Sequence, residues 1–194
     1  MRIEICGGIA SGKTSLANSL KKYGFYAVHE QLGNITFLDE FYSNPELFKF
    51  ETEISFLLQH SVEIKKAMNV AHNIICDYSF EQDYAYATNN LNNQGLQIFK
   101  NVFHEIKQQI DEPNIIIYLQ CSNEIKLERI RNRGRINEQT ITKEYLKNTD
   151  TLISQRLTNL CVPVICFNTE VYDFREAEVT QKIILPLISA NLSS

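Results

Sequence analysis

The feature that most constrains the fold is a glycine-rich motif close to the amino terminus. Residues 7–14 read GGIASGKT, which fits the pattern G-x-x-x-x-G-K-[ST]. An apolar segment precedes the motif at Arg2–Gly7, and a helical pattern follows it at Ser11–Tyr23. A loop in this position turns its backbone N–H groups inward around a phosphate, and the helix start adds the positive end of its dipole. The sequence therefore predicts a nucleotide-phosphate site at Gly7, Gly8, Ile9, Ala10, Ser11, Gly12, Lys13 and Thr14.

Two side chains of this loop have chemistry of their own. We expect the Lys13 amine to meet the β- and γ-phosphates, and the Thr14 hydroxyl to ligate Mg²⁺. A glycine-rich turn that binds no ligand is the alternative interpretation. The position of the motif between an apolar strand and a helix favours ATP and Mg²⁺ as cofactors.

Short apolar runs alternate with longer helical patterns from end to end. The expected strands are Arg2–Gly7, Tyr26–Glu30, Asn73–Tyr78, Asn114–Gln120 and Val162–Asn168. The expected helices are Ser11–Tyr23, Pro45–Ala71, Gln82–Leu91, Gly95–Ile110, Asn123–Arg131 and Thr142–Leu157, with another after Tyr172. This alternation is typical of a parallel sheet covered by helices on both faces. We therefore predict an α/β fold with a five-stranded parallel sheet and a single domain over residues 1–194.

Composition and charge narrow the class of partner. Apolar residues make up 44% and charged residues 22%, which indicates a globular chain. A formal net charge of -4 provides no basic field for polymeric nucleic acid or an anionic membrane. The apolar runs are too short to span a bilayer, and residues 1–4, MRIE, lack a secretory pattern. The five cysteines form no C-x-x-C pair and are expected to be buried thiols. We expect a cytoplasmic protein with a small-molecule ligand and no membrane partner.

Carboxylates follow two of the expected strands. Glu30 ends the segment Tyr26–Glu30, and Asp77 follows Asn73–Cys76. Parallel strands end at one edge of a sheet, so both acids should converge on the glycine-rich loop. We expect Asp77 to be a magnesium-side acid, unless it only starts a turn with Ser79, and Glu30 to orient and deprotonate an acceptor hydroxyl. The neighbouring His29 is expected to point to the opposite face as a structural residue.

The arginines are distributed very unevenly. After Arg2 there is none until position 129, where a cluster begins. Its members are Arg129, Arg131, Arg133 and Arg135. Such a cluster suits a lid over residues 129–141 that closes on the transferring phosphoryl group, or else a solvated basic face paired with Glu124 and Glu128. An acceptor that already carries phosphate normally needs arginine in the middle of the chain, so its absence there favours an uncharged acceptor.

At this point the chain resembles the bacterial deoxynucleoside kinases of the deoxyadenosine/deoxyguanosine kinase type, over roughly residues 1–168. Glu30 matches the catalytic-base position of that family, and Phe41–Pro45 is similar to its F-Y-x-D-P segment. Residues 77–79, DYS, lie at its D/E-R-S motif, and residues 127–135 resemble its lid. The resemblance implies a P-loop kinase fold with an arginine-bearing lid, and a homodimer.

The same resemblance implies roles for residues that line an acceptor pocket. Tyr42 and Glu138 match the residues that hold the sugar 3′-hydroxyl, and Asp83 matches a pocket aspartate. Three positions depart from the family: Tyr78 replaces an arginine, Glu53 a base-reading glutamine and His60 another arginine. The chain is therefore a divergent member.

Glu53 and His60 are seven residues apart on one expected helix and can line the same wall. An ionised glutamate only accepts hydrogen bonds, so Glu53 should favour a base that presents donors, such as guanine or cytosine. Glu53→Gln should then move the preference toward adenine. The alternative is that Glu53 pairs with a lysine or with His60 and reads no base.

The sequence as a whole favours ATP-dependent phosphoryl transfer to the 5′-hydroxyl of a deoxynucleoside, best a purine, in nucleotide salvage. The expected catalytic residues are Lys13, Glu30, Arg129, Arg133 and Arg135. A nucleoside monophosphate kinase on the same fold is disfavoured by the missing arginines. A nucleotide-binding regulator descended from a kinase is the other alternative, because of Tyr78, Glu53 and His60.

Overall fold

Five parallel strands form one sheet at the centre of the computed structural model, which describes residues 1–192. The strands are β1 Arg2–Cys6, β2 Tyr26–Val28, β3 Ile74–Cys76, β4 Ile115–Gln120 and β5 Val164–Asn168. Their order across the sheet is β2-β3-β1-β4-β5. Ile3 of β1 pairs with Ile75 on one side and Ile115 on the other. The predicted α/β fold with a five-stranded parallel sheet is confirmed.

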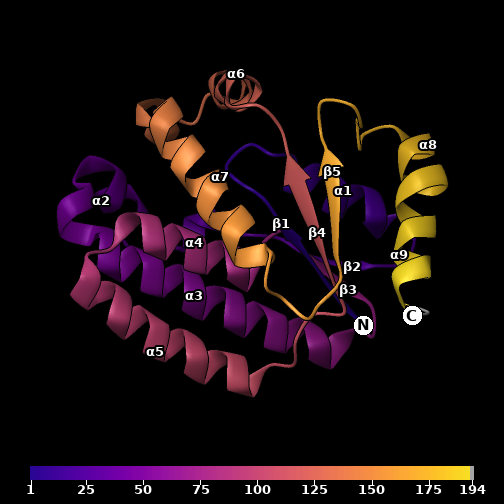
Figure 1. Ribbon diagram of the computed structural model, residues 1–194, viewed down its shortest axis with the longest axis horizontal. Coiled ribbons are helices and arrows are strands. Elements are labelled where there is room, and N and C mark those ends of the chain that lie inside the picture. Colours follow the sequence, from indigo (N-terminus) through magenta and orange to yellow (C-terminus); the bar gives the residue numbers. More distant parts are fainter. Residues whose placement is uncertain (193–194) are drawn as a thin grey trace.

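Helices cover both faces of this sheet (Figure 1). The first is α1 Lys13–Lys21, followed by α2 Leu38–Ser43, α3 Pro45–Val70, α4 Phe80–Asn90, α5 Asn93–Gln109, α6 Asn123–Arg133, α7 Lys143–Leu157, α8 Ala177–Val179 and α9 Leu185–Leu192. Helix α1 and the carboxyl-terminal helices α8 and α9 lie on one side of the sheet, whereas α3, α4, α5 and α7 lie on the other. Short 3₁₀ turns occur at Leu32–Asn34 and Ile136–Thr140, and a π turn at Thr180–Ile184 joins α8 to α9.

The core follows from the apolar strands. Ile3, Ile5 and Ile117 pack with Leu16 and Leu20 of α1 on one face. On the other face, Leu57 and Ile64 of α3 pack with apolar side chains of β3, α4 and α5. A strand covered on both faces reads as a continuous apolar run, which explains why β4 was detectable in the sequence. β1 instead alternates, and its buried Arg2 and Glu4 form an ion pair.

Two expectations need correction. β2 ends at Val28, so His29 and Glu30 lie in the loop after it, where the alternation of a strand no longer applies. His29 consequently does not point away: its Nδ1 lies 3.0 Å from Oδ2 of Asp77. Helix α2, Leu38–Ser43, was not expected, because this short segment has no clear apolar period. It begins after Phe37, whose φ of 71° is left-handed.

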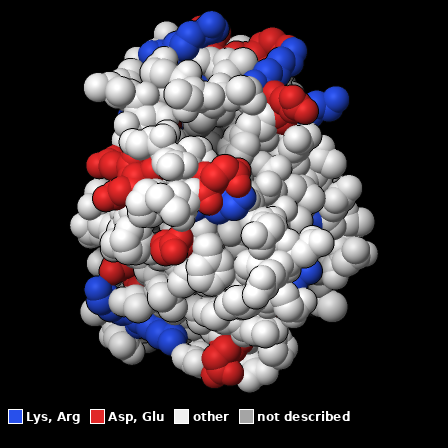
Figure 2. Space-filling view, turned by 90° about the vertical axis from the view of Figure 1, so that its left-hand side faces the viewer, with Lys and Arg blue, Asp and Glu red and all other residues white. Residues whose placement is uncertain are grey.

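The surface shows no large region of one sign on the face in Figure 2, where Lys and Arg side chains are interleaved with Asp and Glu. Within residues 1–192, no helix combines the length and the apolar character needed to cross a membrane.

Candidate active site

The glycine-rich loop runs from the end of β1 at Cys6 to the start of α1 at Lys13. Gly12 has a φ of 102°, a conformation that L side chains rarely adopt, so glycine is required where the loop turns into the helix. The Lys13 amine donates to the carbonyl oxygens of Gly7 at 2.8 Å and Gly8 at 3.1 Å. The buried Ser11 hydroxyl has no hydrogen-bond partner among the described residues. The Ser11 hydroxyl is therefore available for a hydrogen bond to a ligand at the predicted phosphate site.

An ion pair between a buried lysine and a partly exposed aspartate supports the loop from behind. Lys126 of α6, only 1% exposed, binds both carboxylate oxygens of Asp150 in α7. A Cβ on Gly8 would lie 2.7 Å from Oδ1 of Asp150 and 3.0 Å from Nζ of Lys126. Gly8 therefore lets the loop backbone lie directly against this pair.

Glu30 and Asp77 meet at the same edge of the sheet, as predicted. The backbone N–H of Glu30 donates to Oδ1 of Asp77 at 2.6 Å. Burial raises the pKa of Glu30, but His60, Lys13 and Arg135 outweigh it and hold the pKa below its usual value. Glu30 is thus an ionised carboxylate close to cationic side chains. Burial lowers the pKa of the Lys13 amine, against the opposing effect of Glu30 and Asp77.

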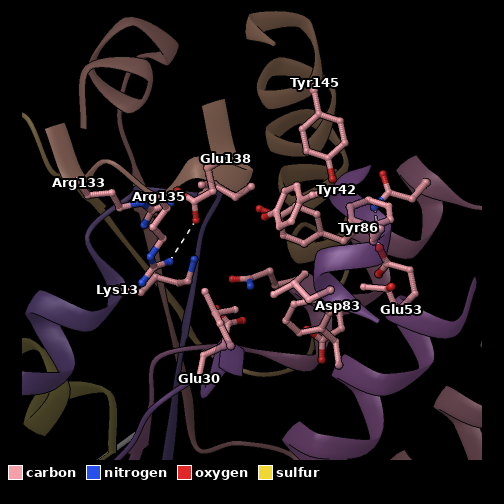
Figure 3. A pocket seen from close by; sticks show the side chains of 18 residues that line it. Lys13, Glu30, Tyr42, Glu53, Asp83, Tyr86, Arg133, Arg135, Glu138 and Tyr145 are labelled. Carbon is pink, nitrogen blue, oxygen red and sulfur yellow. Dashed lines mark hydrogen bonds and ion pairs between the residues drawn. The ribbon is translucent and has the colours of Figure 1, made fainter. Parts of the chain in front are cut away.

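A cleft opens at this edge (Figure 3). Figure 3 shows Lys13, Arg133 and Arg135 at one end, Glu53 and Tyr86 at the other, and Glu30 between the two ends. Its walls also include Ile9, Leu32, Leu38, Phe41, Tyr42, Thr52, Phe56, Gln82, Asp83, Asn90, Glu138 and Tyr145. The end with Lys13, Arg133 and Arg135 is suited to an anion. The end with Glu53 and Tyr86 is suited to a flat ring with polar groups at its edge.

Glu138 lies in the 3₁₀ turn after α6 and accepts hydrogen bonds from two arginines of the lid. Arg133 Nε donates to Glu138 Oε2 at 2.5 Å, and Arg135 Nη1 donates to Oε1 at 3.1 Å. Asn137 donates to Asp39 of α2 at 2.6 Å, so the lid is attached to the helix across the cleft. Of the predicted lid residues, Arg133, Arg135 and Glu138 line the cleft.

Arg129 has a different placement. Its Nη1 donates to the carbonyl oxygen of Ala10 at 3.1 Å and to Oγ1 of Thr169 at 3.0 Å. Its Nη2 donates to the Thr169 carbonyl oxygen at 2.9 Å. The guanidinium thus joins the lid helix to the glycine-rich loop and the segment after β5. A contact between Arg129 and a phosphate stays a prediction.

Tyr42 lies near the lid on the opposite wall of the cleft. Burial raises its pKa to about 12, and the Glu138 carboxylate contributes to this shift. The phenol is therefore a hydrogen-bond donor at all ordinary pH values, facing an acceptor carboxylate. The structure thus brings together the two residues that were expected to bind one hydroxyl.

Glu53 lies at the far end of the cleft and is 4% exposed. Its Oε1 accepts a 2.6 Å hydrogen bond from the Asn90 amide. Burial raises the pKa of Glu53 to about 8, only partly offset by this hydrogen bond, and the nearby Asp83 adds to the rise. This shift favours the neutral carboxyl group near neutral pH over the ionised form that the sequence analysis assumed. A neutral carboxyl group both donates and accepts, as a glutamine amide does.

Asp83 lines the cleft, whereas His60 lies behind the wall. His60 Nδ1 is 2.8 Å from Oδ2 of Asp83, and Nε2 is 3.5 Å from Oε1 of Glu30. His60 was expected to contact the substrate, but its ring reaches the cleft only through these two acids. Glu53 does not pair with His60, because its partner is Asn90.

Four polar residues of the cleft were not singled out from the sequence: Thr52, Gln82, Asn90 and Tyr145. Gln82 precedes Asp83 in the first turn of α4, and its buried Oε1 has no partner within residues 1–192. Periodicity does not distinguish such residues from other polar positions of a helix. Only the packing of α4 against α7 brings Asn90 and Tyr145 to one wall.

The comparison with protein families decides which P-loop protein this is. The deoxynucleoside kinase family model matches residues 3–192. The chain belongs to the deoxynucleoside kinase family.

Curated members of this family resemble the chain over most of its length. The deoxyguanosine kinase of Bacillus subtilis is 31% identical over 150 residues, which cover 75% of this chain and 72% of that protein. The deoxyadenosine/deoxycytidine kinase of the same organism is 25% identical over 187 residues, covering 91% and 86%. The deoxyadenosine kinase of Dictyostelium discoideum is 29% identical over 175 residues, covering 86% and 71%.

Solved deoxynucleoside kinases have the same fold. The deoxyadenosine kinase from M. mycoides with bound dCTP gives a TM-score of 0.81 at 21% identity and covers 98% of this chain and 100% of that chain. The same enzyme with bound dATP gives 0.74 at 24% identity, with full coverage of both chains. The predicted P-loop kinase fold and the resemblance stated from the sequence are confirmed. So is the prediction of a kinase that phosphorylates a nucleoside from a nucleotide donor.

Proposed function

We propose that this deoxynucleoside kinase transfers the γ-phosphoryl group of ATP to the 5′-hydroxyl of a purine deoxynucleoside. The observation that carries the proposal is the ionised Glu30 between the Lys13 end of the cleft and the Glu53 end. A carboxylate there can accept a hydrogen bond from a hydroxyl that points toward the phosphate site. The reaction depends mostly on positioning and charge stabilisation, because its transition state is loose.

The phosphate end fits ATP. When the triphosphate binds, the Lys13 amine would exchange its hydrogen bonds to Gly7 and Gly8 for phosphate oxygens. The unpartnered Ser11 hydroxyl is available to the same ligand. Arg133 and Arg135 would share the negative charge that develops on the transferring group. Arg129, which donates to the carbonyl oxygen of Ala10 in the loop, would hold the lid helix at a fixed position relative to the phosphates.

The same end fits a magnesium ion. Thr14 is exposed at the start of α1, and each Asp77 oxygen accepts one hydrogen bond within the chain and keeps a lone pair. Mg²⁺ usually takes one or two protein oxygens and completes its shell with water and phosphate oxygens. Thr14 and Asp77 would hold the ion, which would neutralise phosphate charge.

The acceptor end favours an uncharged sugar and a purine base. Tyr42 and Glu138 would bind the 3′-hydroxyl, and Glu30 would orient the 5′-hydroxyl and take its proton. Glu53, Asn90 and Asp83 would face the edge of the base. Several relatives are named for deoxyguanosine or deoxyadenosine, which supports the choice of a purine.

One assay tests the proposal against its alternatives. ADP release is measured with a panel of free nucleosides and nucleoside monophosphates. We expect purine deoxynucleosides to stimulate turnover and monophosphates not to do so. Turnover with monophosphates alone would favour the monophosphate kinase, and ATP binding without turnover on any acceptor would favour the regulator.

The proposal includes a homodimer in the cytoplasm. Exposed apolar side chains on neighbouring helices support an interface between two copies: Leu58 and Val62, one turn apart on α3, are 47% and 45% exposed. Ile98 on α5 is 45% exposed. Light scattering after gel filtration should give twice the chain mass, and Leu58→Lys with Val62→Lys should give the monomer. A monomeric wild type would contradict the dimer.

A further inference from the structure

His60 is a buried histidine that joins two acids of the cleft wall. It is 1% exposed and lies on α3. Asp83, its partner at Nδ1, comes from α4, and Glu30, which faces Nε2, comes from the loop after β2. Both acids line the cleft, whereas His60 does not.

The ring is also held in its plane. Tyr78, which follows β3, stacks on His60 with ring centroids 3.7 Å apart and an interplanar angle of 7°. The Tyr78 hydroxyl donates to the backbone carbonyl of His60 at 3.4 Å. On α3 itself, the Phe56 ring lies 5.8 Å from the imidazole. The imidazole therefore has little freedom to rotate away from either acid.

The charge balance supports a bridging cation. Burial lowers the pKa of His60, but the carboxylates of Asp83 and Glu30 outweigh burial and raise it to about 10. A protonated ring donates from both nitrogens. Within residues 1–192, Nε2 makes no hydrogen bond, and Oε1 of Glu30 lies 3.5 Å from it, within ion-pair distance.

We propose that His60 is a positioning residue that fixes Glu30 relative to Asp83 and does not contact the substrate. This inference rests on the proposed function. Asp83 faces the proposed base position, and Glu30 lies between that position and the Lys13 end of the cleft. The separation of the two acids therefore determines where the 5′-hydroxyl lies when the base is bound. His60 aligns the two ends through its two nitrogens.

Two conservative variants separate the contacts. An asparagine amide reaches about as far from the backbone as imidazole Nδ1, and a glutamine amide reaches about as far as Nε2. His60→Asn keeps a partner for Asp83 and loses the one for Glu30, so we expect kcat to fall at least about tenfold with little change in nucleoside KM. His60→Gln keeps the contact to Glu30, so we expect nucleoside KM to rise at least about tenfold with kcat near wild type.

His104→Asn is the matched control, because His104 lies exposed on α5 and its ring hydrogen-bonds Gln108 on the same helix. It should change neither constant. Equal changes of kcat and KM in both His60 variants, or no change in either, would overturn the proposal.

A measurement on the wild type covers the case in which neither variant folds. With ¹⁵N-labelled histidine, NMR should find protons on both ring nitrogens of His60 at pH 7, before and after addition of deoxyguanosine. A neutral ring, or loss of a proton on binding, would overturn the proposal. Absence of nucleoside-stimulated ADP release in the wild type would instead overturn the proposed function, and the NMR measurement would still test His60.

Discussion

The backbone N–H of Glu30 donates a 2.6 Å hydrogen bond to Oδ1 of Asp77, so the acid after β3 fixes the acid after β2. β2 and β3 are parallel neighbours, and both loops therefore leave the sheet at the same edge. Asp77 has a positioning role toward Glu30 in addition to its proposed role toward Mg²⁺.

Substitutions of Asp77 separate these two roles. Asp77→Asn keeps an oxygen acceptor for the Glu30 N–H but loses the charge. We expect it to need about tenfold more Mg²⁺ for half-maximal turnover, with kcat at saturating Mg²⁺ within about threefold of wild type. Asp77→Ala also loses the acceptor, so kcat should fall at least a further tenfold. Magnesium titrations of turnover measure both, and identical behaviour of the two variants would contradict the assignment.

The protonation of Glu53 should control the choice of purine. Because burial raises its pKa to about 8, the carboxyl group is neutral below that pH and ionised above it. The neutral group donates and accepts, which suits the N1 and N6 amine of adenine, whereas the carboxylate only accepts, which suits the N1–H and N2 amine of guanine.

The ratio of kcat/KM for deoxyguanosine to that for deoxyadenosine should therefore rise at least about fivefold from pH 6.5 to pH 9. Glu53→Gln is the control, since an amide does not titrate in this range, and its ratio should stay flat and favour adenine. If the wild-type and variant ratios change in parallel, Glu53 does not read the base.

Tyr42 and Glu138 are the proposed partners of the sugar 3′-hydroxyl. Removing the Tyr42 hydroxyl should therefore weaken the binding only of substrates that have this group. Tyr42→Phe removes the phenol that faces Glu138 and should raise the KM for deoxynucleosides about tenfold, the equivalent of one hydrogen bond to a charged network. It should leave the KM for the matching 3′-deoxy analogue unchanged, because that analogue lacks the group that Tyr42 binds. Equal losses with both substrates would place Tyr42 elsewhere.

The ion pair behind the glycine-rich loop predicts an effect on stability. Asp150→Ala leaves the buried Lys126 ammonium without its partner and should lower the free energy of unfolding by about 3 kcal/mol. Lys126→Met should cost less, because the remaining Asp150 carboxylate is partly exposed. The control is Lys143→Met, which breaks the exposed pair with Glu124 and should leave stability unchanged. Urea unfolding measures all three, and an effect of Asp150→Ala no larger than the control would contradict this account.

Much of the fold was predictable, because the features that determine it are local. The apolar run of β4 is buried on both faces and stands out in the sequence, and the glycine-rich loop after β1 has a fixed pattern. The convergence of Glu30 and Asp77 followed from parallel topology alone. The lid cluster was visible because arginine is absent from residues 3–128.

Other features depend on contacts that no local pattern encodes. His60 and Asp83 are 23 residues apart, and Lys126 and Asp150 are 24 apart, so each pair appears only when the helices pack. The protonation of Glu53 depends on its burial, which periodicity does not reveal on a helix that is partly exposed along its length. Arg129 belongs to the lid motif, yet tertiary packing directs its guanidinium to the backbone of Ala10.

The most direct test of the central claim compares turnover with ATP binding in Glu30→Gln. This substitution keeps the shape of the side chain and removes the carboxylate proposed to take the 5′-hydroxyl proton. We predict that kcat falls at least about a hundredfold, while the ATP Kd from equilibrium dialysis stays within about twofold of wild type. A variant that keeps its kcat, or that loses ATP affinity in proportion to turnover, would contradict the account.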